Sequence, residues 1–267
     1  MQHFIPYSEY IRLHPEFLYY DPKLPEDIKI TTITSLFTFP LSFHTDYIAD
    51  NIPLSDDFII SIKHGNTTDT HRSIINLDKK SSNTVNSQYK SKSRKNFYFQ
   101  TTLIIKQNDI LINVKIFRNG TIQITGSKNI SMVIWIVDII LKMFKDAKMS
   151  VYADPVDFCD LSKLIDFKII MMNCVFTLNF YINREVTTKL LESDNKLTSV
   201  WFDPQRHSGI NLKYIRNVKD NERLISLIIF EKGNIILSSA IDYEDIIETY
   251  KYVKTLLLSN YDNISKS

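Results

Sequence analysis

The feature that most constrains this chain is a short pattern that occurs twice. The first copy, "KIFRNGTIQITGSK", covers Lys115–Lys128, and the second, "LIIFEKGNIILSSA", covers Leu227–Ala240. Each copy places a Phe three residues before a Gly and then continues with an alternating apolar run that ends at Thr or Ser. The whole chain has only 5 glycines in 267 residues, so composition does not explain two of them in matching places. The pattern predicts two copies of one folding unit.

A second pair of segments supports this prediction. "IKITTITSLFTF" (28–39) aligns without gaps to "FKIIMMNCVFTL" (167–178), a shift of 139 residues (28 to 167), whereas the two Phe–Gly segments are 113 apart (117 to 230). An insertion at 66–96 in the first copy accounts for the difference, and its Ser-, Asn-, Thr- and Lys-rich composition predicts a flexible loop. The basic residues toward its end either are merely solvated or form an arm that touches phosphates: Lys79, Lys80, Lys90, Lys92, Arg94 and Lys95.

Each Phe–Gly segment is followed by six apolar residues at helical spacing, in places that match between the copies. Shorter helices are expected at 44–51 and 184–193, and strands at 58–62 and 224–230. Each copy therefore reads as strand, short helix, several strands and long helix. This order predicts an α+β fold with helices on one face of an antiparallel sheet. The expected organisation is an N-terminal extension at 1–27, a first copy at 28–150 and a second copy at 151–267.

Several functional classes are disfavoured by the sequence. The formal net charge of +2 neither requires nor excludes a nucleic-acid partner. The two cysteines, Cys159 and Cys174, have no metal-ligand spacing and are expected to be free thiols. No signal peptide is recognisable, and the most apolar run, 130–144, is too short to span a bilayer, so we expect a protein that is neither secreted nor membrane-bound. We expect no metal, cofactor or enzymatic activity, and regard three carboxylates between the copies as solvated linker residues: Asp154, Asp157 and Asp160.

Strand alternation predicts which side chains point away from the helices. This helix-free face mixes aromatic and aliphatic groups with hydroxyls and amides and has little charge. Such a face either binds a partner or packs against the aromatic N-terminal stretch 4–20. Its predicted residues are Asn113, Lys115, Phe117, Gln123 and Thr125 in the first copy, and Ser226, Ile228, Phe230, Ile236 and Ser238 in the second.

The paired segments and their helices resemble the TATA-box-binding protein family. Each repeat of that family carries a strand ending in Phe, a turn with Gly, a second strand ending in Thr-Gly and a long helix. The Asp-Phe-Lys-Ile start at 166–169 is similar to the opening strand of the family's second repeat, and the resemblance covers roughly 28–260. It implies a duplicated saddle with a curved antiparallel sheet of about ten strands, four helices on the convex face and a concave DNA-binding face. The insertion and the N-terminal extension resemble the divergent versions found in large DNA viruses.

The resemblance also implies roles for individual residues. Each family repeat inserts two aromatic wedges between base steps of the minor groove. The matching positions are Phe58 and Phe117 in the first copy, and His207 and Phe230 in the second; imidazole stacks on a base but is a poor wedge. The family's phosphate-contacting arginines are matched by other residues that can carry a positive charge: Lys63, His64 and Lys213.

The remaining implied residues face the floor of the groove. Met171 stands where the family has an asparagine and cannot donate a hydrogen bond, whereas Asn173 lies two residues on, on the same face, and is placed to substitute. Lys115 and Gln123 replace family aliphatics, so the face is asymmetric. The full set of groove-face residues is Thr32, Thr34, Met171, Asn173, Lys115, Gln123, Thr125, Ile228, Ile236 and Ser238.

By this resemblance, the expected function is that of a DNA-binding transcription-initiation factor. It would bend A·T-rich promoter DNA through the minor groove and nucleate the preinitiation complex. The expected partners are double-stranded A·T-rich DNA, general initiation factors and RNA polymerase, with no membrane, cofactor or small-molecule substrate. The expected location is the host nucleus or a cytoplasmic viral factory, with packaging in the virion as a further option. The alternative is a degenerate saddle that serves as a protein-interaction module in a transcription complex without strong DNA binding.

Overall fold

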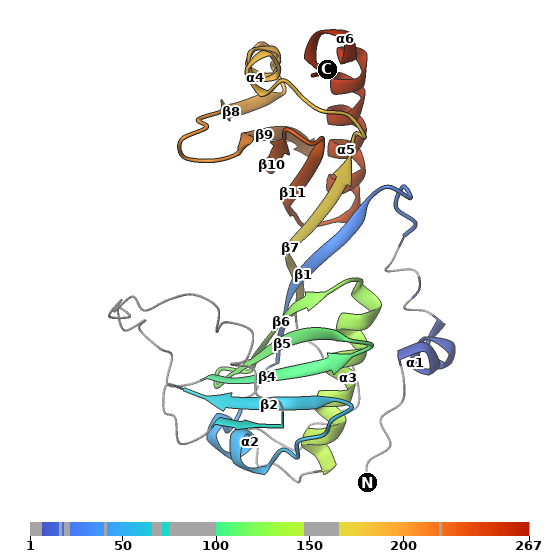
Figure 1. Ribbon diagram of the computed structural model, residues 1–267. Helices are drawn as coiled ribbons and strands as arrows, with labels where there is room; N and C mark the ends of the chain where they lie inside the picture. The colour runs from blue at the N-terminus through green and yellow to red at the C-terminus, as the bar shows by residue number, and fades with distance from the viewer. Residues whose placement is uncertain are drawn as a thin grey trace. The chain divides into compact units, whose positions relative to one another are not determined.

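The computed structural model describes residues 7–15, 18, 22–39, 42–65, 71–74, 100–146, 166–218 and 221–266 (Figure 1). The chain divides into two compact units. Unit 1 comprises Met1–Leu18 and Ser35–Lys168, and unit 2 comprises Tyr19–Thr34 and Ile169–Ser267. Strand β1 (Lys29–Thr38) therefore gives its first residues to unit 2 and its last residues to unit 1. The predicted boundaries of the two sequence copies stay a prediction.

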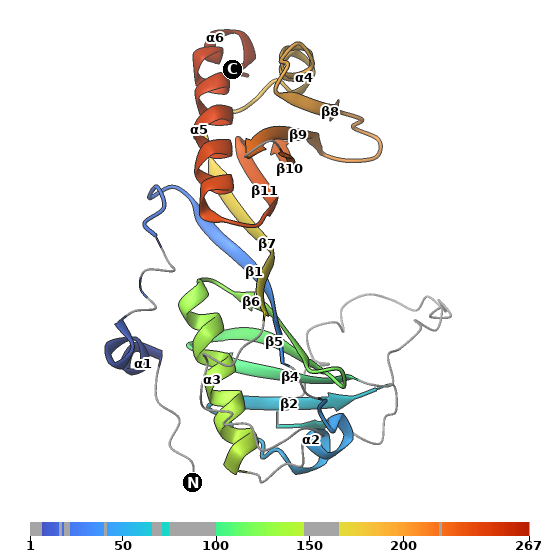
Figure 2. The same cartoon turned by 180° about the vertical axis from the view of Figure 1, so that it is seen from behind.

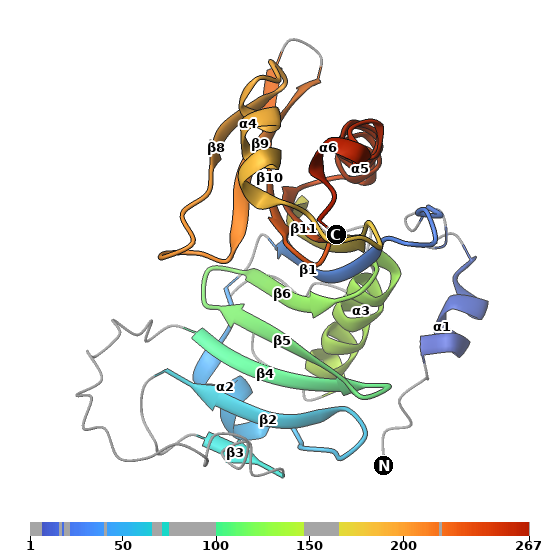
Figure 3. The same cartoon turned by 45° about the horizontal axis from the view of Figure 1, so that its top comes forward.

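Unit 1 is a sheet with helices packed on it (Figure 3). The strand β3 falls inside the insertion and pairs with β2, and Arg72 of β3 donates to the carbonyls of Ala49 and Ile52 at the end of α2. The six basic residues named above at the end of the insertion lie outside the described residues. The elements are α1 (Tyr7–Leu13), α2 (Thr45–Asn51), β2 (Ile59–His64), β3 (His71–Ser73), β4 (Gln100–Gln107), β5 (Ile110–Phe117), β6 (Thr121–Ser127) and α3 (Ile130–Asp146).

Among the described residues, unit 2 repeats this order of strands and helices, without counterparts of α1 and β3. Its elements are most of β7 (Asp166–Thr177), then α4 (Arg184–Glu192), β8 (Leu197–Trp201), β9 (Gly209–Val218), β10 (Asn221–Phe230), β11 (Asn234–Ala240), α5 (Tyr243–Ser259) and α6 (Tyr261–Ile264). Among the described residues, the strand order is β3-β2-β4-β5-β6-β1-β7-β11-β10-β9-β8. The predicted α+β class is confirmed, with eleven strands rather than about ten and with two short helices, α1 and α6, in addition to the four expected.

The strand pairings of the two units coincide. Gln100 pairs with Phe117 in unit 1 as Gly209 pairs with Phe230 in unit 2. The next pairs inward follow the same rule: Lys115 pairs with Gln123, and Ile228 with Ile236. These registers make β4 the counterpart of β9, and the strand order then makes β2 the counterpart of β8.

The core of unit 1 lies between the sheet and α3. The buried residues of β5 alternate with less buried ones, as expected for a strand with one covered face. Every described side chain of α3 from Ile130 to Phe144 is buried except Lys142, which is half-buried. Figures 1 and 2, taken from opposite sides, show α3 crossing the strands. Helix α1 packs against α3 through the buried Tyr10, so residues 7–15 lie on the helix side and do not cover the other face.

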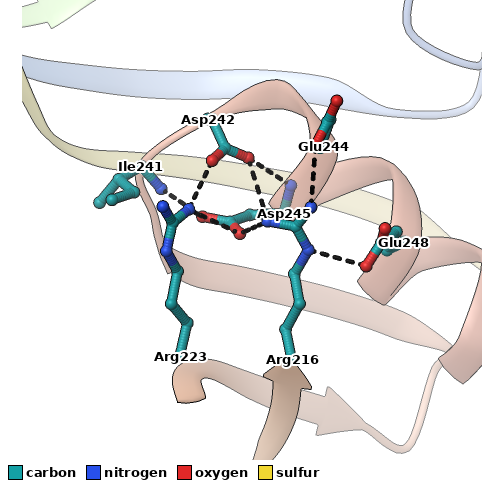
Figure 4. A network of polar contacts seen from close by, with 7 residues as sticks. All are labelled: Arg216, Arg223, Ile241, Asp242, Glu244, Asp245 and Glu248. Atoms are coloured by element: carbon teal, nitrogen blue, oxygen red, sulfur yellow. Dashed lines mark hydrogen bonds and ion pairs between the residues drawn. The ribbon is translucent and has the colours of Figure 1, made fainter. Parts of the chain in front are cut away.

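In unit 2, charged hydrogen bonds hold the first turns of the long helix α5 against the sheet (Figure 4). Asp245, fully buried in the first turn of α5, accepts hydrogen bonds from Arg216 of β9 and from Arg223 of β10. Arg216 also donates through Nε to Glu248 (2.7 Å) and through Nη2 to Glu244 (3.0 Å). These contacts tie the start of α5 to two neighbouring strands, and Arg216 itself is 4% exposed.

The first prediction concerns this network. Replacing Arg216 by Ala leaves the buried Asp245 carboxylate without its main partner, and breaking a buried pair in this way costs about 3–5 kcal/mol. The free energy of unfolding from urea titration should fall by that amount. The matched control is Arg206→Ala, since Arg206 pairs with Asp203 on the surface (3.3 Å) and such pairs contribute about 1 kcal/mol or less. Equal effects of the two substitutions would contradict the assignment.

The second prediction concerns acid. Burial alone would raise the pKa of Asp242, but hydrogen bonds from the Asp245 backbone N–H and from Arg223 outweigh burial and hold the pKa below its ordinary value of 3.8. A lowered carboxylate pKa stabilises the fold above the unfolded value, and this stability is lost as the pH falls through the folded value. Asp242→Asn keeps an N-cap for α5 and removes the charge. Its free energy of unfolding should therefore fall less steeply below about pH 4 than that of the wild type; an identical slope would count against this role.

Candidate nucleic-acid interface

The helix-free side of unit 2 is a strip of apolar and hydroxyl or amide side chains. Its registers are continuous across the strands: Ile228 pairs with Ile236 on one side and with Asn211 on the other. Ser226 likewise lies between Ser238 and Lys213. We call this the bare face of unit 2, and it consists of Thr32, Thr34, Met171, Asn173, Val175, Thr177, Asn211, Lys213, Ser226, Ile228, Phe230, Asn234, Ile236 and Ser238.

The bare face of unit 1 is more polar. Lys115 lies between Thr102 and Gln123 in the register, where unit 2 has Ile228 between Asn211 and Ile236. It consists of Lys63, Thr102, Ile104, Lys106, Asn113, Lys115, Phe117, Gln123 and Thr125. None of the residues named for the two bare faces is acidic. The exposed Glu222 at the start of β10 shares the side of Ser226, but the lysines of unit 1 still favour a polyanion there.

The structure places most predicted groove residues on these faces. In β1, Thr32 and Thr34 alternate with the fully buried Ile33, although Thr34 is itself only 7% exposed. In β7, Met171 and Asn173 alternate in the same way with the buried Met172. The other six predicted groove residues lie on the two bare faces as defined above.

Three of the four predicted wedge residues also lie on this side. The rings of His207 and Phe230 are 6.1 Å apart between centroids, and both side chains are half-buried. Phe117 occupies the place in unit 1 that Phe230 occupies in unit 2, because Gln100 and Gly209 are their respective partners.

Phe58 does not belong to this group. Its side chain is 1% exposed and packs edge-on against Trp135 of α3, with ring centroids 5.6 Å apart, so it lies in the helix-covered core. The sequence analysis matched the strand that follows Phe58, β2, to the strand that follows His207, β9. The strand order shows that the counterpart of β9 is β4, the neighbour of β2. In the sequence, Tyr98 precedes Gln100 by two residues as His207 precedes Gly209, and Tyr98 lies outside the described residues.

The predicted phosphate contacts divide in a similar way. Lys63 is exposed and pairs with Thr102, and Lys213 is half-buried and pairs with Ser226, so both belong to bare faces. His64, one residue further along β2, points to the helix side and its Nδ1 is 2.8 Å from Oγ1 of the buried Thr101. This position does not suit a phosphate contact on the bare face.

One aromatic residue of this surface was missed by the sequence analysis. Trp201, the last residue of β8, is 44% exposed and its ring meets that of His207 at 6.4 Å between centroids. Trp201 pairs with Asn211, which is part of the bare face of unit 2. The sequence could have indicated this residue, because Trp201 lies shortly before the predicted wedge residue His207.

Three further predictions concern membrane spans, metal ligands and cysteines. No helix in the described part of the chain is long and apolar enough to cross a membrane. The same residues contain no cluster of three or more His, Cys, Asp or Glu side chains that could hold a metal ion, and Asp154, Asp157 and Asp160 lie outside them. Cys174 is a free thiol, and burial raises its pKa to about 12, which makes the reactive thiolate scarce.

Comparisons with known proteins agree with the resemblance seen in the sequence. No protein-family model matches the chain. A TATA-box-binding protein-like protein of Acanthamoeba polyphaga mimivirus is 28% identical over 258 residues, which cover 89% of this chain and 67% of that protein. The TATA-box-binding protein of Aeropyrum pernix is 24% identical over 151 residues, covering 57% of this chain and 64% of that protein. The solved structure of Methanococcus jannaschii TBP matches with a TM-score of 0.46 and 16% identity, covering 87% of this chain and 99% of that one.

The sequence similarity to the mimivirus protein extends over most of the chain and is therefore not confined to one unit. The predicted resemblance to the TATA-box-binding protein family is thereby confirmed.

Proposed function

We propose that this protein is a DNA-binding transcription-initiation factor whose bare faces bind and bend the minor groove of an A·T-rich duplex. The observation that carries the proposal is the coincidence of registers that gives Phe117 and Phe230 the same place in their units. Two equivalent aromatic residues, each at the end of a strand and bordered by uncharged and basic side chains, suit a ligand that is itself repetitive and anionic. The same coincidence supports descent of the two units from one duplicated ancestor.

The chemistry of the two faces fits the minor groove. There an A·T pair presents only acceptors, so a reader needs donors and shape instead of a donor–acceptor code. Lys115, Gln123 and Thr125 supply donors in unit 1. Ile228 and Ile236 supply a flat apolar surface in unit 2, suited to sugar edges, and Phe230 borders it. Inserted aromatic side chains unstack a base step, and A·T-rich steps deform at the lowest cost.

The relatives extend the proposal beyond DNA. They are the TATA-box-binding protein of Aeropyrum pernix and the TATA-box-binding protein-like protein of the mimivirus. By analogy we assign this protein the same role, with general initiation factors and RNA polymerase as partners. The site of action would then be the host nucleus or a viral factory.

The third prediction tests DNA binding. Fluorescence anisotropy with a labelled A·T-rich duplex should show salt-sensitive binding. Phe117→Ala and Phe230→Ala should each weaken the affinity about 10-fold or more, because base–aromatic stacking contributes about 1–3 kcal/mol per base. Leu258→Ala, an equally apolar truncation at an exposed position of α5, should change nothing. Absence of duplex binding, or binding indifferent to both Phe substitutions, would refute the proposal.

The fourth prediction concerns Gly209, which pairs with Phe230 on the neighbouring strand. A Cβ at position 209 would lie 2.6 Å from Cγ2 of Ile228 and 3.3 Å from Cδ1 of Phe230. Gly209→Ala should therefore displace these side chains from the bare face and weaken duplex binding several-fold, while the neighbouring exposed Ser208→Ala should not. Thermal unfolding of both variants serves as the folding control. Wild-type affinity in a folded Gly209→Ala protein would show that the position of Phe230 does not matter.

A further inference from the structure

We propose that Trp201 is a base-stacking residue that gives unit 2 a different mode of contact from unit 1. This inference rests on the proposed function and assigns a role to a side chain that the family resemblance did not point to. Its ligand is the exposed face of a base at an opened step of the duplex. The geometry that supports it comes from the pairing of β8 with β9.

A β-bulge turns Trp201 toward the bare face of unit 2. Thr198 pairs with Lys213, and the next pair joins Trp201 to Asn211, so β8 advances three residues while β9 advances two. In a regular strand, residues three apart point to opposite faces. The extra residue restores Trp201 to the face of Thr198, and Ser199 within the bulge has φ 52°. Bulges of this kind commonly re-aim a side chain next to a functional site.

Trp201 extends an aromatic row that includes two predicted wedge positions. The ring of His207 lies between those of Trp201 and Phe230, at centroid distances of 6.4 Å and 6.1 Å. His207 is held in place from behind, since the Gly209 backbone N–H donates to its Nδ1 at 3.1 Å. We call Trp201, His207 and Phe230 the aromatic row. It offers an extended π-surface where a single imidazole would be a weak wedge.

The exposure of Trp201 distinguishes it from a core residue. Trp135, the other tryptophan of the chain, is 3% exposed and packs on Phe58, whereas Trp201 is 44% exposed on a face that no helix of the described residues covers. An indole ring presents a large, rigid apolar surface with only two side-chain torsions, so it gains contact area at a low entropic cost. Bases stack on such rings irrespective of sequence.

The register counterpart of Trp201 is Lys63. Trp201 lies opposite Asn211, and Lys63 lies opposite Thr102, which occupies in unit 1 the place of Asn211 in unit 2. The same place therefore holds a cation in one unit and an aromatic ring in the other. We infer that unit 1 contacts the phosphates at this place, while unit 2 stacks on a base. Such a division would make the two ends of the complex different, so that the protein binds the duplex in one preferred orientation.

The experiment compares Trp201→Ala, Trp201→Phe and Lys63→Ala on an A·T-rich duplex that carries 2-aminopurine, whose fluorescence rises on unstacking. Trp201→Ala should weaken the affinity about 10-fold, leave the salt dependence unchanged and reduce the fluorescence rise. Trp201→Phe should keep most of both. Lys63→Ala should lower the slope of log affinity against log salt by about 1 and leave the fluorescence rise intact.

The outcomes separate this inference from the proposed function. If the wild type binds the duplex and depends on Phe230, but both Trp201 variants match the wild type, the role of Trp201 is refuted and the proposed function stands. If Trp201→Ala alters the salt slope instead of the fluorescence, Trp201 acts on phosphate placement and the stacking role is likewise refuted. If the wild type binds no duplex, both proposals fall. Should Trp201→Ala not fold, Trp201→Leu takes its place, because leucine keeps an apolar side chain but removes the aromatic ring; stacking predicts the same loss of affinity and of fluorescence rise for it, and wild-type behaviour of this variant would refute the role.

Discussion

The structure depends above all on antiparallel pairing at a fixed register. Because side chains alternate along a strand, a shift of one residue would exchange the covered and bare faces. Gln100 opposite Phe117, and Gly209 opposite Phe230, set this register in the two units. From it follow the burial of the isoleucine- and valine-rich side beneath the helices and the gathering of Lys, Gln, Thr and Phe on the other side. The candidate interface is therefore a direct consequence of the pairing that builds the core.

The two units secure their covered faces by different means. In unit 1, α3 is buried almost all round, and α1 adds a further apolar contact through Tyr10. In unit 2, α5 is amphipathic, with exposed residues such as Leu258, and the buried Arg216–Asp245 pair ties its first turn to β9 and β10. Apolar contacts alone set the position of a helix on its sheet less strictly, whereas a buried charge pair fixes the position of the two groups and costs desolvation energy. Neither solution uses a residue of the bare faces, so each face is left free for a ligand.

Much of this architecture could be predicted from the sequence, because the helical and strand periodicities are strong. The two long helices, the α+β class and the alternation around Phe117 and Phe230 are confirmed. The errors have local causes. The insertion separates β2 from β4, so the apolar strand nearest the expected position was matched to β9, which placed Phe58 and His64 on the wrong side. The bulge before Trp201 has no signature in the residue types, since Ser199 adopts its positive φ only in the context of the pairing.

The most direct test of the account asks whether the bare faces enter the minor groove. A hydroxyl-radical source tethered to cysteine at position 123 or 236, in a background with Cys159 and Cys174 replaced, would cut bound A·T-rich DNA near each tether. The account predicts cuts on the two strands offset toward their 3′ ends, the pattern of a source in the minor groove, and no cuts from a tether at position 251 on α5. Cutting from position 251, or an offset typical of the major groove from positions 123 and 236, would contradict it.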